Sequence, residues 1–292
     1  MLPLIGMVVV VTAVLGGYLL ESGHLLALVQ PAEGVIIVGA AIGTLIAANS
    51  PQQLRSAWSG VITVFRNPTP TKQFYVSTLL MLHSLFEYAR RNGATKLEDQ
   101  LDNPEHFVVF RRHAKVIHDP VTVDFICDTL RLTTLGQVSR FELDELLEQD
   151  SDIRERTLRE SSTTLITLAD SLPGLGILSA VLGVVITMNS LREIPKTIGM
   201  KVASALVGTF LGIFLSYGFA APIAAHLERI QEAELIYYQT LRAAIAAFAR
   251  GMPIAISLEF ARRGIPPDLR PGFAELERAC RQSSGKIVEI PP

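Results

Sequence analysis

The chain has 292 residues, a formal net charge of −2 and 18% charged residues, below the roughly 25% of an average soluble domain. Its mean hydropathy of +0.36 indicates a membrane-embedded part, and its charge argues against a nucleic-acid partner. The two cysteines, Cys127 and Cys280, form no C-x-x-C pair and have no neighbouring histidine pair. We therefore expect neither a disulfide framework nor a metal site, and no cofactor.

Four stretches without Asp, Glu, Lys or Arg are long enough to cross a bilayer, which takes a helix of about 20 residues. They are Met1 to Leu20, Gly34 to Gln53, Ser171 to Leu191 and Val202 to Leu227. The first has no basic residue before its apolar run and no A-x-A site before Glu21. This pattern favours a retained membrane span over a cleaved signal peptide.

The distribution of basic residues predicts the orientation of the spans, because cytoplasmic flanks are enriched in Lys and Arg. Arg55 follows the second stretch, Arg154 precedes the third and Arg229 follows the fourth, whereas residues 21–33 contain no Lys or Arg. The loop at 192–201 also carries basic residues and favours the opposite orientation. The majority of the basic flanks predict that both termini lie in the cytoplasm.

The long segment between the second and third stretches has the pattern of amphipathic helices. Apolar residues recur at helical spacing from Phe74 to Phe86, and Gly93 supplies a stop. Thr95 and Glu98 have the spacing of a capping box at the start of a new helix. Taken alone, Arg90 and Glu98 would be solvated helix ends. No part of this region is rich in strand formers, so its sequence predicts an all-helical domain.

Small residues recur every fourth position in the fourth stretch, at Ser204, Gly208, Gly212, Ser216 and Ala220, and at Gly39 and Gly43 in the second. Such patterns let helix backbones approach closely in lipid. The sequence leaves open whether the partner helices belong to the same subunit or to another one.

Hydroxyl side chains occur in the last two stretches, at Thr187, Thr209, Ser216 and Tyr217. They can bond to a carbonyl one turn back or to a neighbouring helix, or line a path for water. A proton relay in a membrane normally uses Asp, Glu or His, and the nearest candidates, Glu33 and His226, lie at the edges of the stretches. If the chain helps to conduct an ion, we expect another chain to bring the ionisable group.

Two prolines have different predicted effects. Pro173 follows Asp170 and Ser171, which could cap a helix, so it is predicted to begin the third span. Pro222 lies within the fourth span and removes the bond to the carbonyl of Gly218, which predicts a kink.

The sequence contains no phosphate-binding loop and no G-x-G-x-x-G, H-E-x-x-H or G-x-S-x-G motif, so we expect it not to be an enzyme. Short stretches along the whole chain resemble the MotA-type stator subunits of the bacterial flagellar motor, within the MotA/TolQ/ExbB proton channel family. These stretches include Gly16 to Tyr18, Gln30 to Glu33, Asp170 to Pro173, Val207 to Ile213, Tyr217 to Phe219 and Arg270 to Phe273. An ExbB- or TolQ-like energiser of outer-membrane processes is the alternative within the same architecture, and a transporter is the alternative from another class.

The resemblance implies a complex in which five copies of the chain surround two copies of MotB. MotB would supply the proton-accepting Asp, and proton flow would drive torque on the rotor protein FliG. The resemblance also implies roles for individual residues. These are Arg90 and Glu98 at the rotor contact, Pro173 and Pro222 in conformational coupling, and Ala180, Thr209 and Tyr217 facing the channel. Ala180 stands where sodium-driven relatives tend to have threonine, which favours protons.

The predicted fold is therefore an all-α, polytopic integral protein of the bacterial inner membrane, with four transmembrane helices and a helical cytoplasmic domain between helices two and three. The predicted segments are transmembrane helix 1 at 1–20, a periplasmic loop at 21–33, transmembrane helix 2 at 34–50, the cytoplasmic domain at 51–170, transmembrane helix 3 at 171–191, a periplasmic loop at 192–201, transmembrane helix 4 at 202–227, and a cytoplasmic C-terminal helix and tail at 228–292.

Overall fold

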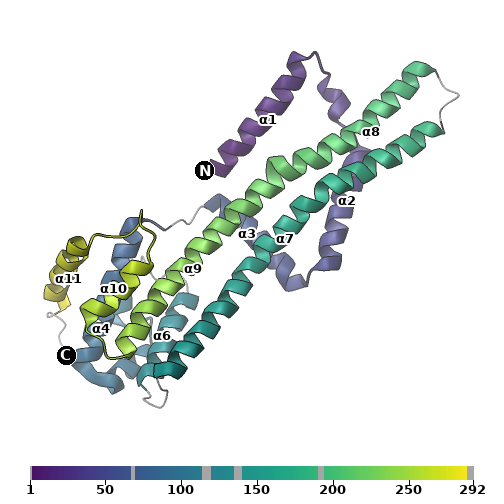
Figure 1. Cartoon of the computed structure of the whole chain (residues 1–292). Helices are drawn as coiled ribbons and strands as arrows, with labels where there is room; N and C mark the ends of the chain where they lie inside the picture. The colour runs from purple at the N-terminus through teal and green to yellow at the C-terminus, as the bar shows by residue number, and fades with distance from the viewer. Residues whose placement is uncertain (1, 67–69, 114–119, 135–139, 190–193, 288–292) are drawn as a thin grey trace. The chain divides into compact units, whose positions relative to one another are not determined.

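The computed structural model describes residues 2–66, 70–113, 120–134, 140–189 and 194–287 (Figure 1). In this part of the chain all regular elements are helical, as the sequence predicts. The elements are α1 (Leu2–Leu20), the short 3₁₀ helix η1 (Leu25–Leu28), α2 (Pro31–Ala48), α3 (Pro51–Arg66), α4 (Lys72–Leu101), α5 (Val108–Arg112), α6 (Pro120–Thr134), α7 (Arg140–Met188), α8 (Pro195–Leu215), the π turn η2 (Ser216–Ala220), α9 (Ala221–Ala249), α10 (Ile254–Gly264) and α11 (Phe273–Ile287).

Four helical segments among the described residues are long and apolar enough to cross a membrane. They are Leu2–Leu20, Leu25–Ala48, Phe141–Met188 and Pro195–Ala249, and each contains most of one predicted span. Helix α2 begins at Pro31, so Glu33, which the sequence assigns to a loop, lies in its first turn.

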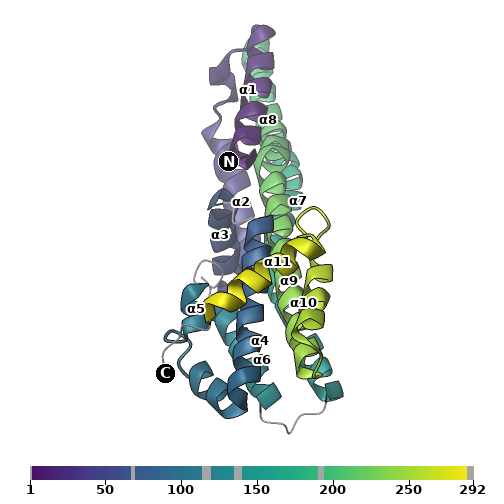
Figure 2. The same ribbon diagram turned by 90° about the vertical axis from the view of Figure 1, so that its left-hand side faces the viewer.

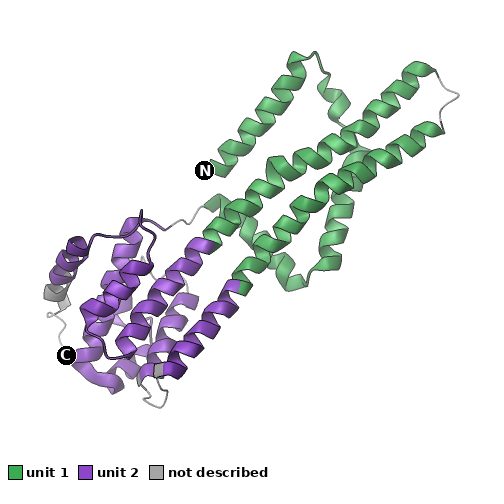
Figure 3. Ribbon diagram, viewed as in Figure 1, with its two compact units in different colours: residues 1–68, 156–231 green, residues 69–155, 232–292 purple. Residues whose placement is uncertain are grey.

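The chain divides into two compact units, each built from two separate parts of the sequence (Figure 3). Unit 1 comprises residues 1–68 and 156–231, and unit 2 comprises residues 69–155 and 232–292. The C-terminal segment therefore folds together with the region around α4 to α6, and is not a separate tail. Its position in sequence alone gives no indication of this.

Unit 1 buries few of its apolar side chains within the chain. One small core contains Ala57, Leu165 and Leu227, and another contains Ile37 and Leu172. Many large apolar side chains on the same helices are exposed, for example Val8, Ile42, Val185, Leu206 and Ile213. An exposed apolar surface of this extent is typical of helices that contact lipid or other subunits.

Unit 2 has a conventional apolar core. Phe86 stacks on Phe248 with ring centroids 4.3 Å apart, and α10 and α11 both pack against α4 (Figure 2). The guanidinium of Arg154 lies 3.6 Å from the ring centroid of Tyr238, whose hydroxyl shares a hydrogen bond with Thr122.

Both cysteines lie in unit 2 as thiols. Burial raises the pKa of the Cys127 thiol to about 12 and that of Cys280 to about 11.

Candidate functional site

The central feature of unit 1 is a close backbone contact between α7 and α8. A Cβ added at Gly212 would lie 2.6 Å from the carbonyl oxygen of Leu172 and 2.7 Å from the Cα of Gly176. A Cβ at Gly208 would lie 3.1 Å from the Cβ of Ser179. At Gly212 only glycine permits this approach, and both Gly208 and Gly212 of the predicted stripe pack against α7 of the same chain.

The second small-residue pattern behaves differently. A Cβ at Gly39 or Gly43 in α2 would meet no atom of the described chain within 4 Å. These two glycines therefore do not serve a helix contact within this part of the chain.

Pro173 lies inside α7 and not at its start, contrary to the prediction. The Ser171 hydroxyl bonds back to the carbonyl of Leu168 at 2.8 Å instead of capping a helix. A proline inside a helix leaves the carbonyl four residues earlier without its usual donor, and here that carbonyl belongs to Ala169. The buried hydroxyl of Ser216 donates to this oxygen at 2.7 Å, so the freed carbonyl is satisfied from outside α7.

Pro222 lies in the first turn of α9, directly after the π turn η2. The backbone N–H of Ala221 bonds to the carbonyl of Ser216, five residues earlier. A π turn is a recognised way of accommodating a disturbed helix ladder. The predicted disturbance is therefore present as a widened turn, and Ser216, which contacts the carbonyl freed by Pro173, begins that turn.

The three predicted channel-facing residues have different surroundings. Ala180 is buried where α7 meets α8, with its backbone nitrogen 3.3 Å from the Cβ position of Gly208. Thr209 is half-buried on α8, and Tyr217 is 68% exposed on η2. Their channel-facing role stays a prediction.

The sequence interpretation missed the burial of Glu33. Only 6% of this residue is exposed, and its Oε2 accepts a hydrogen bond from the Ser179 hydroxyl. Glu33, which the sequence places at the edge of the second stretch, is therefore held inside a helix contact at the start of α2. The sequence signal was available, since Glu33 directly precedes the second apolar stretch.

The two residues predicted to contact the rotor are both exposed on α4. Between them Gly93 has φ +81°, a left-handed conformation that favours glycine, and interrupts the helix as predicted. Neither Arg90 nor Glu98 takes part in an ion pair with another described residue. Their side chains are thus accessible to another molecule.

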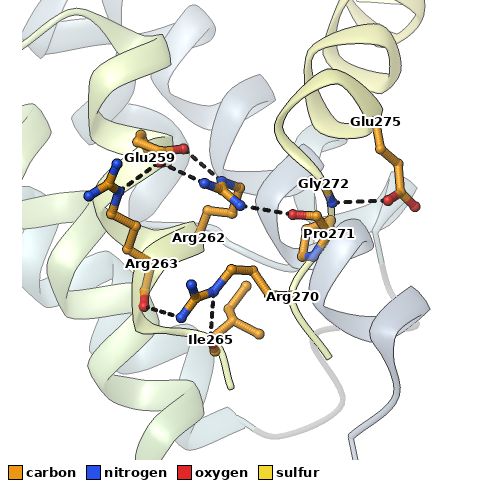
Figure 4. Close-up of polar contacts among 8 residues, drawn as sticks. All are labelled: Glu259, Arg262, Arg263, Ile265, Arg270, Pro271, Gly272 and Glu275. Carbon is orange, nitrogen blue, oxygen red and sulfur yellow. Dashed lines mark hydrogen bonds and ion pairs between the residues drawn. The ribbon is translucent and has the colours of Figure 1, made fainter. Parts of the chain in front are cut away.

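A polar cluster fixes the segment that contains the Arg-Pro-Gly-Phe stretch (Figure 4). Arg262 donates to both carboxylate oxygens of Glu259, at 2.7 and 2.8 Å, and to the carbonyl of Pro271 at 3.1 Å. Arg270 donates to the carbonyls of Ile265 and Arg263, both at 2.9 Å. These bonds attach the start of α11 to the end of α10.

The same segment is attached to α4 by a charged pair. Lys72 donates to the Glu275 carboxylate at 2.8 Å, and the backbone N–H of Gly272 donates to the same oxygen at 3.0 Å. Both bonds, that of Lys72 first, lower the pKa of Glu275. Because the pair is largely exposed, we expect only a small contribution to stability.

Acid should weaken the Arg262–Glu259 contact. Hydrogen bonds from Arg262 above all, and also from Arg263, lower the pKa of Glu259 from 4.5 to about 2. Because the pKa of Glu259 is lowered in the folded state, its ionised carboxylate stabilises the fold at any pH above the ordinary carboxyl pKa of 4.5. This stabilisation is lost as the pH falls toward 2. We expect Glu259→Gln to lower the free energy of unfolding by about 2 kcal/mol at pH 7. Thermal melting of the detergent-purified chain measures this loss. The difference in stability from wild type should shrink as the pH falls from 4.5 to 2.

Glu277→Gln is the matched control for this prediction. Glu277 forms an exposed ion pair with Arg281 one turn away on α11, and such pairs contribute little. A loss in Glu259→Gln that is no larger than in Glu277→Gln, or that does not change with pH, would contradict the prediction.

Comparison with known proteins identifies the family. The chain is 36% identical over 281 residues to "Motility protein A" of Salmonella typhimurium and to that of Escherichia coli, covering 96% of this chain and 95% of each relative. The chain belongs to the MotA family. Residues 4–93 match the Motility protein A N-terminal family, and residues 119–240 match the MotA/TolQ/ExbB proton channel family. That family is one of proton channels and not of enzymes.

Solved structures agree on the fold of this MotA chain. It is similar to a chain of the Campylobacter jejuni MotAB structure, with a TM-score of 0.74, 20% identity and coverage of 91% of this chain and 96% of that one. It is also similar to a chain of the Bacillus subtilis flagellar MotAB stator complex, with a TM-score of 0.71, 21% identity and coverage of 94% and 98%. The match to the MotA N-terminal family favours a MotA protein over the ExbB- or TolQ-like alternative.

Proposed function

We propose that this MotA chain is a stator subunit of the bacterial flagellar motor and that, with MotB, it forms a complex in which proton flow drives torque on the rotor protein FliG. The observation that carries the proposal is the 36% identity to two motility proteins over 96% of the chain. The proposed location is the inner membrane, with both termini in the cytoplasm. The basic flanks of the spans support this orientation.

We also propose an assembly of five copies around two copies of MotB. The exposed apolar faces of unit 1 need either lipid or partner helices to cover them. The open faces at Gly39 and Gly43 would let another helix approach α2 closely. In this arrangement MotB brings the Asp that takes up the proton, and Ala180, Thr209 and Tyr217 face the channel.

The mechanical part of the proposal concerns Pro173 and Pro222. Protonation of a carboxylate changes the free energy of placing it against apolar helices. The neighbouring helices then favour a different arrangement. The bond from Ser216 to the carbonyl of Ala169 joins the sites of both prolines. A shift of α7 at Pro173 would therefore also act on the π turn before Pro222.

The function is tested by complementation. A strain that lacks its stator genes should regain swimming when it receives this chain together with the MotB gene from the same source. Collapse of the proton gradient should stop that swimming, and collapse of the sodium gradient should leave it unchanged. Swimming that depends on sodium would contradict the choice of proton inferred from Ala180, and no swimming with any MotB would contradict the stator function.

The rotor contact is tested by charge exchange. We expect Arg90→Glu and Glu98→Lys each to reduce swimming severalfold, because an exposed charge at an interface supports specific association. An opposite exchange on FliG should restore part of the speed. Arg111→Glu, which changes an exposed arginine on α5 of the same unit, is the control and should not be restored by the same FliG variants. If no FliG exchange restores swimming for either residue, Arg90 and Glu98 are only solvated residues at helix ends, as the sequence alone suggests.

A further inference from the structure

Glu33 is the one acidic side chain among the buried residues that the structure describes. It lies in the first turn of α2 and contacts both helices of the close contact between α7 and α8. Its Oε2 accepts the hydrogen bond from Ser179 on α7. The same oxygen lies 2.7 Å from the Cβ position of Gly208 on α8, and its Oε1 lies 3.3 Å from that of Gly183 on α7.

The residues observed in contact with the carboxyl group carry no charge. Ser179 and Gly183 face it from α7, and Gly208 faces it from α8, with Ala205 against Gly183. Within the described chain Glu33 takes part in no ion pair, and Ser179 is its one hydrogen-bond donor. A lone carboxylate in such a place is costly unless a cation or a proton neutralises it.

The two glycines leave the space that the carboxyl group occupies. An alanine at Gly208 would place its methyl group against Oε2, and one at Gly183 would meet Ala205 at 2.6 Å. The carboxyl group therefore packs into the contact between α7 and α8, in space that Gly183 and Gly208 leave open. It also lies beside Ser179 and Gly208, which directly precede two of the predicted channel-facing residues, Ala180 and Thr209.

We propose that Glu33 is a proton-exchanging carboxyl group of this subunit, in addition to the Asp that MotB brings. A buried ionisable residue at the start of a membrane span is a candidate for part of an ion path. The exchange is a simple proton transfer: an O–H bond of a hydronium ion breaks as a carboxylate oxygen of Glu33 takes up its proton and forms the neutral acid, which later releases that proton to water or to a second carboxylate. No other bond changes. The inference rests on the proposed stator function.

The test compares four variants in the complemented strain that swims with the wild-type chain. Glu33→Gln keeps the size of the side chain and an oxygen that can accept the Ser179 bond, but it cannot exchange a proton. We expect it to co-purify with MotB in normal amounts and to swim about fivefold more slowly. Glu33→Asp keeps the acid and should recover at least about half of the wild-type speed.

Two further variants separate proton exchange from a purely structural role. Ser179→Ala removes the hydrogen bond and leaves the acid in place, so it should slow swimming by less than about twofold. Glu21→Gln makes the same chemical change at an exposed carboxylate that lies 12 residues earlier in the chain. It should swim like wild type.

The outcomes distinguish the inference from the function on which it rests. If the wild-type chain does not restore swimming, the proposed function fails. If the wild-type chain swims and Glu33→Gln swims equally fast, the inference fails alone. Equal slowing by Glu33→Gln and Ser179→Ala, or no recovery in Glu33→Asp, would show that Glu33 only holds the helices together.

Discussion

Replacing Gly212 by alanine is expected to abolish most swimming and to lower the amount of assembled stator complex. The new Cβ would lie 2.6 Å from the Leu172 carbonyl oxygen and 2.7 Å from the Gly176 Cα. Both are backbone atoms, so no side chain can move aside and α7 must separate from α8. Overpacking of this kind costs about 1–3 kcal/mol. Swimming speed, co-purification with MotB and the melting temperature of the purified complex measure the effect.

Gly199→Ala is the matched control for Gly212→Ala. Gly199 lies on the same helix, and a Cβ there would meet no described atom within 4 Å. Because alanine favours a helix over glycine, this variant should assemble and swim normally. Comparable damage in both variants would mean that α8 needs flexible glycines, and that its close contact with α7 is not the reason for Gly212.

Replacing Pro173 by alanine is expected to leave assembly intact and to reduce swimming strongly. Alanine restores a backbone N–H, which can bond to the Ala169 carbonyl inside α7 and compete with the Ser216 hydroxyl. Pro222→Ala should act in a related way, since a restored N–H lets the π turn close into an ordinary helix. Co-purification with MotB reports assembly, and swimming speed reports coupling.

The hydrogen bond from Ser216 to the Ala169 carbonyl allows a more detailed prediction. If Pro173 acts through the freed carbonyl, the double variant Pro173→Ala with Ser216→Ala should be no slower than Pro173→Ala alone, because both changes remove the same contact. Pro195→Ala is the control, since Pro195 lies in the first turn of α8, where a missing N–H costs little. Normal swimming of both Pro173→Ala and Pro222→Ala would rule out a role of the prolines in coupling.

The sequence predicted the helical class and the four apolar segments because charge-free stretches have a direct physical requirement, namely the thickness of the bilayer. It did not predict that α7 continues through Pro173. The carbonyl that Pro173 leaves free accepts a hydrogen bond from a hydroxyl that lies 43 positions after Pro173 in the chain, and local helix-start signals cannot report such a contact.

The candidate site shows the same limit. Gly208 and Gly212 were recognisable from their spacing, but their partners on α7 were not. Glu33 was visible as an acid next to an apolar stretch, yet its burial depends on the meeting of three helices. The roles of Arg90, Glu98, Ala180, Thr209 and Tyr217 come from family resemblance and remain predictions that only motility and ion-flux measurements address.

The thiols of Cys127, which is buried, and Cys280, which is half-buried, have a practical consequence for such measurements. With pKa values of about 12 and about 11, Cys127 and Cys280 carry almost no thiolate at neutral pH and react slowly with maleimides and with oxidants. A cysteine introduced at an exposed position outside the proposed rotor contact, such as Arg111, would then be the preferred target for a fluorophore or cross-linker. Labelling of the introduced cysteine can therefore be tried first with Cys127 and Cys280 left in place.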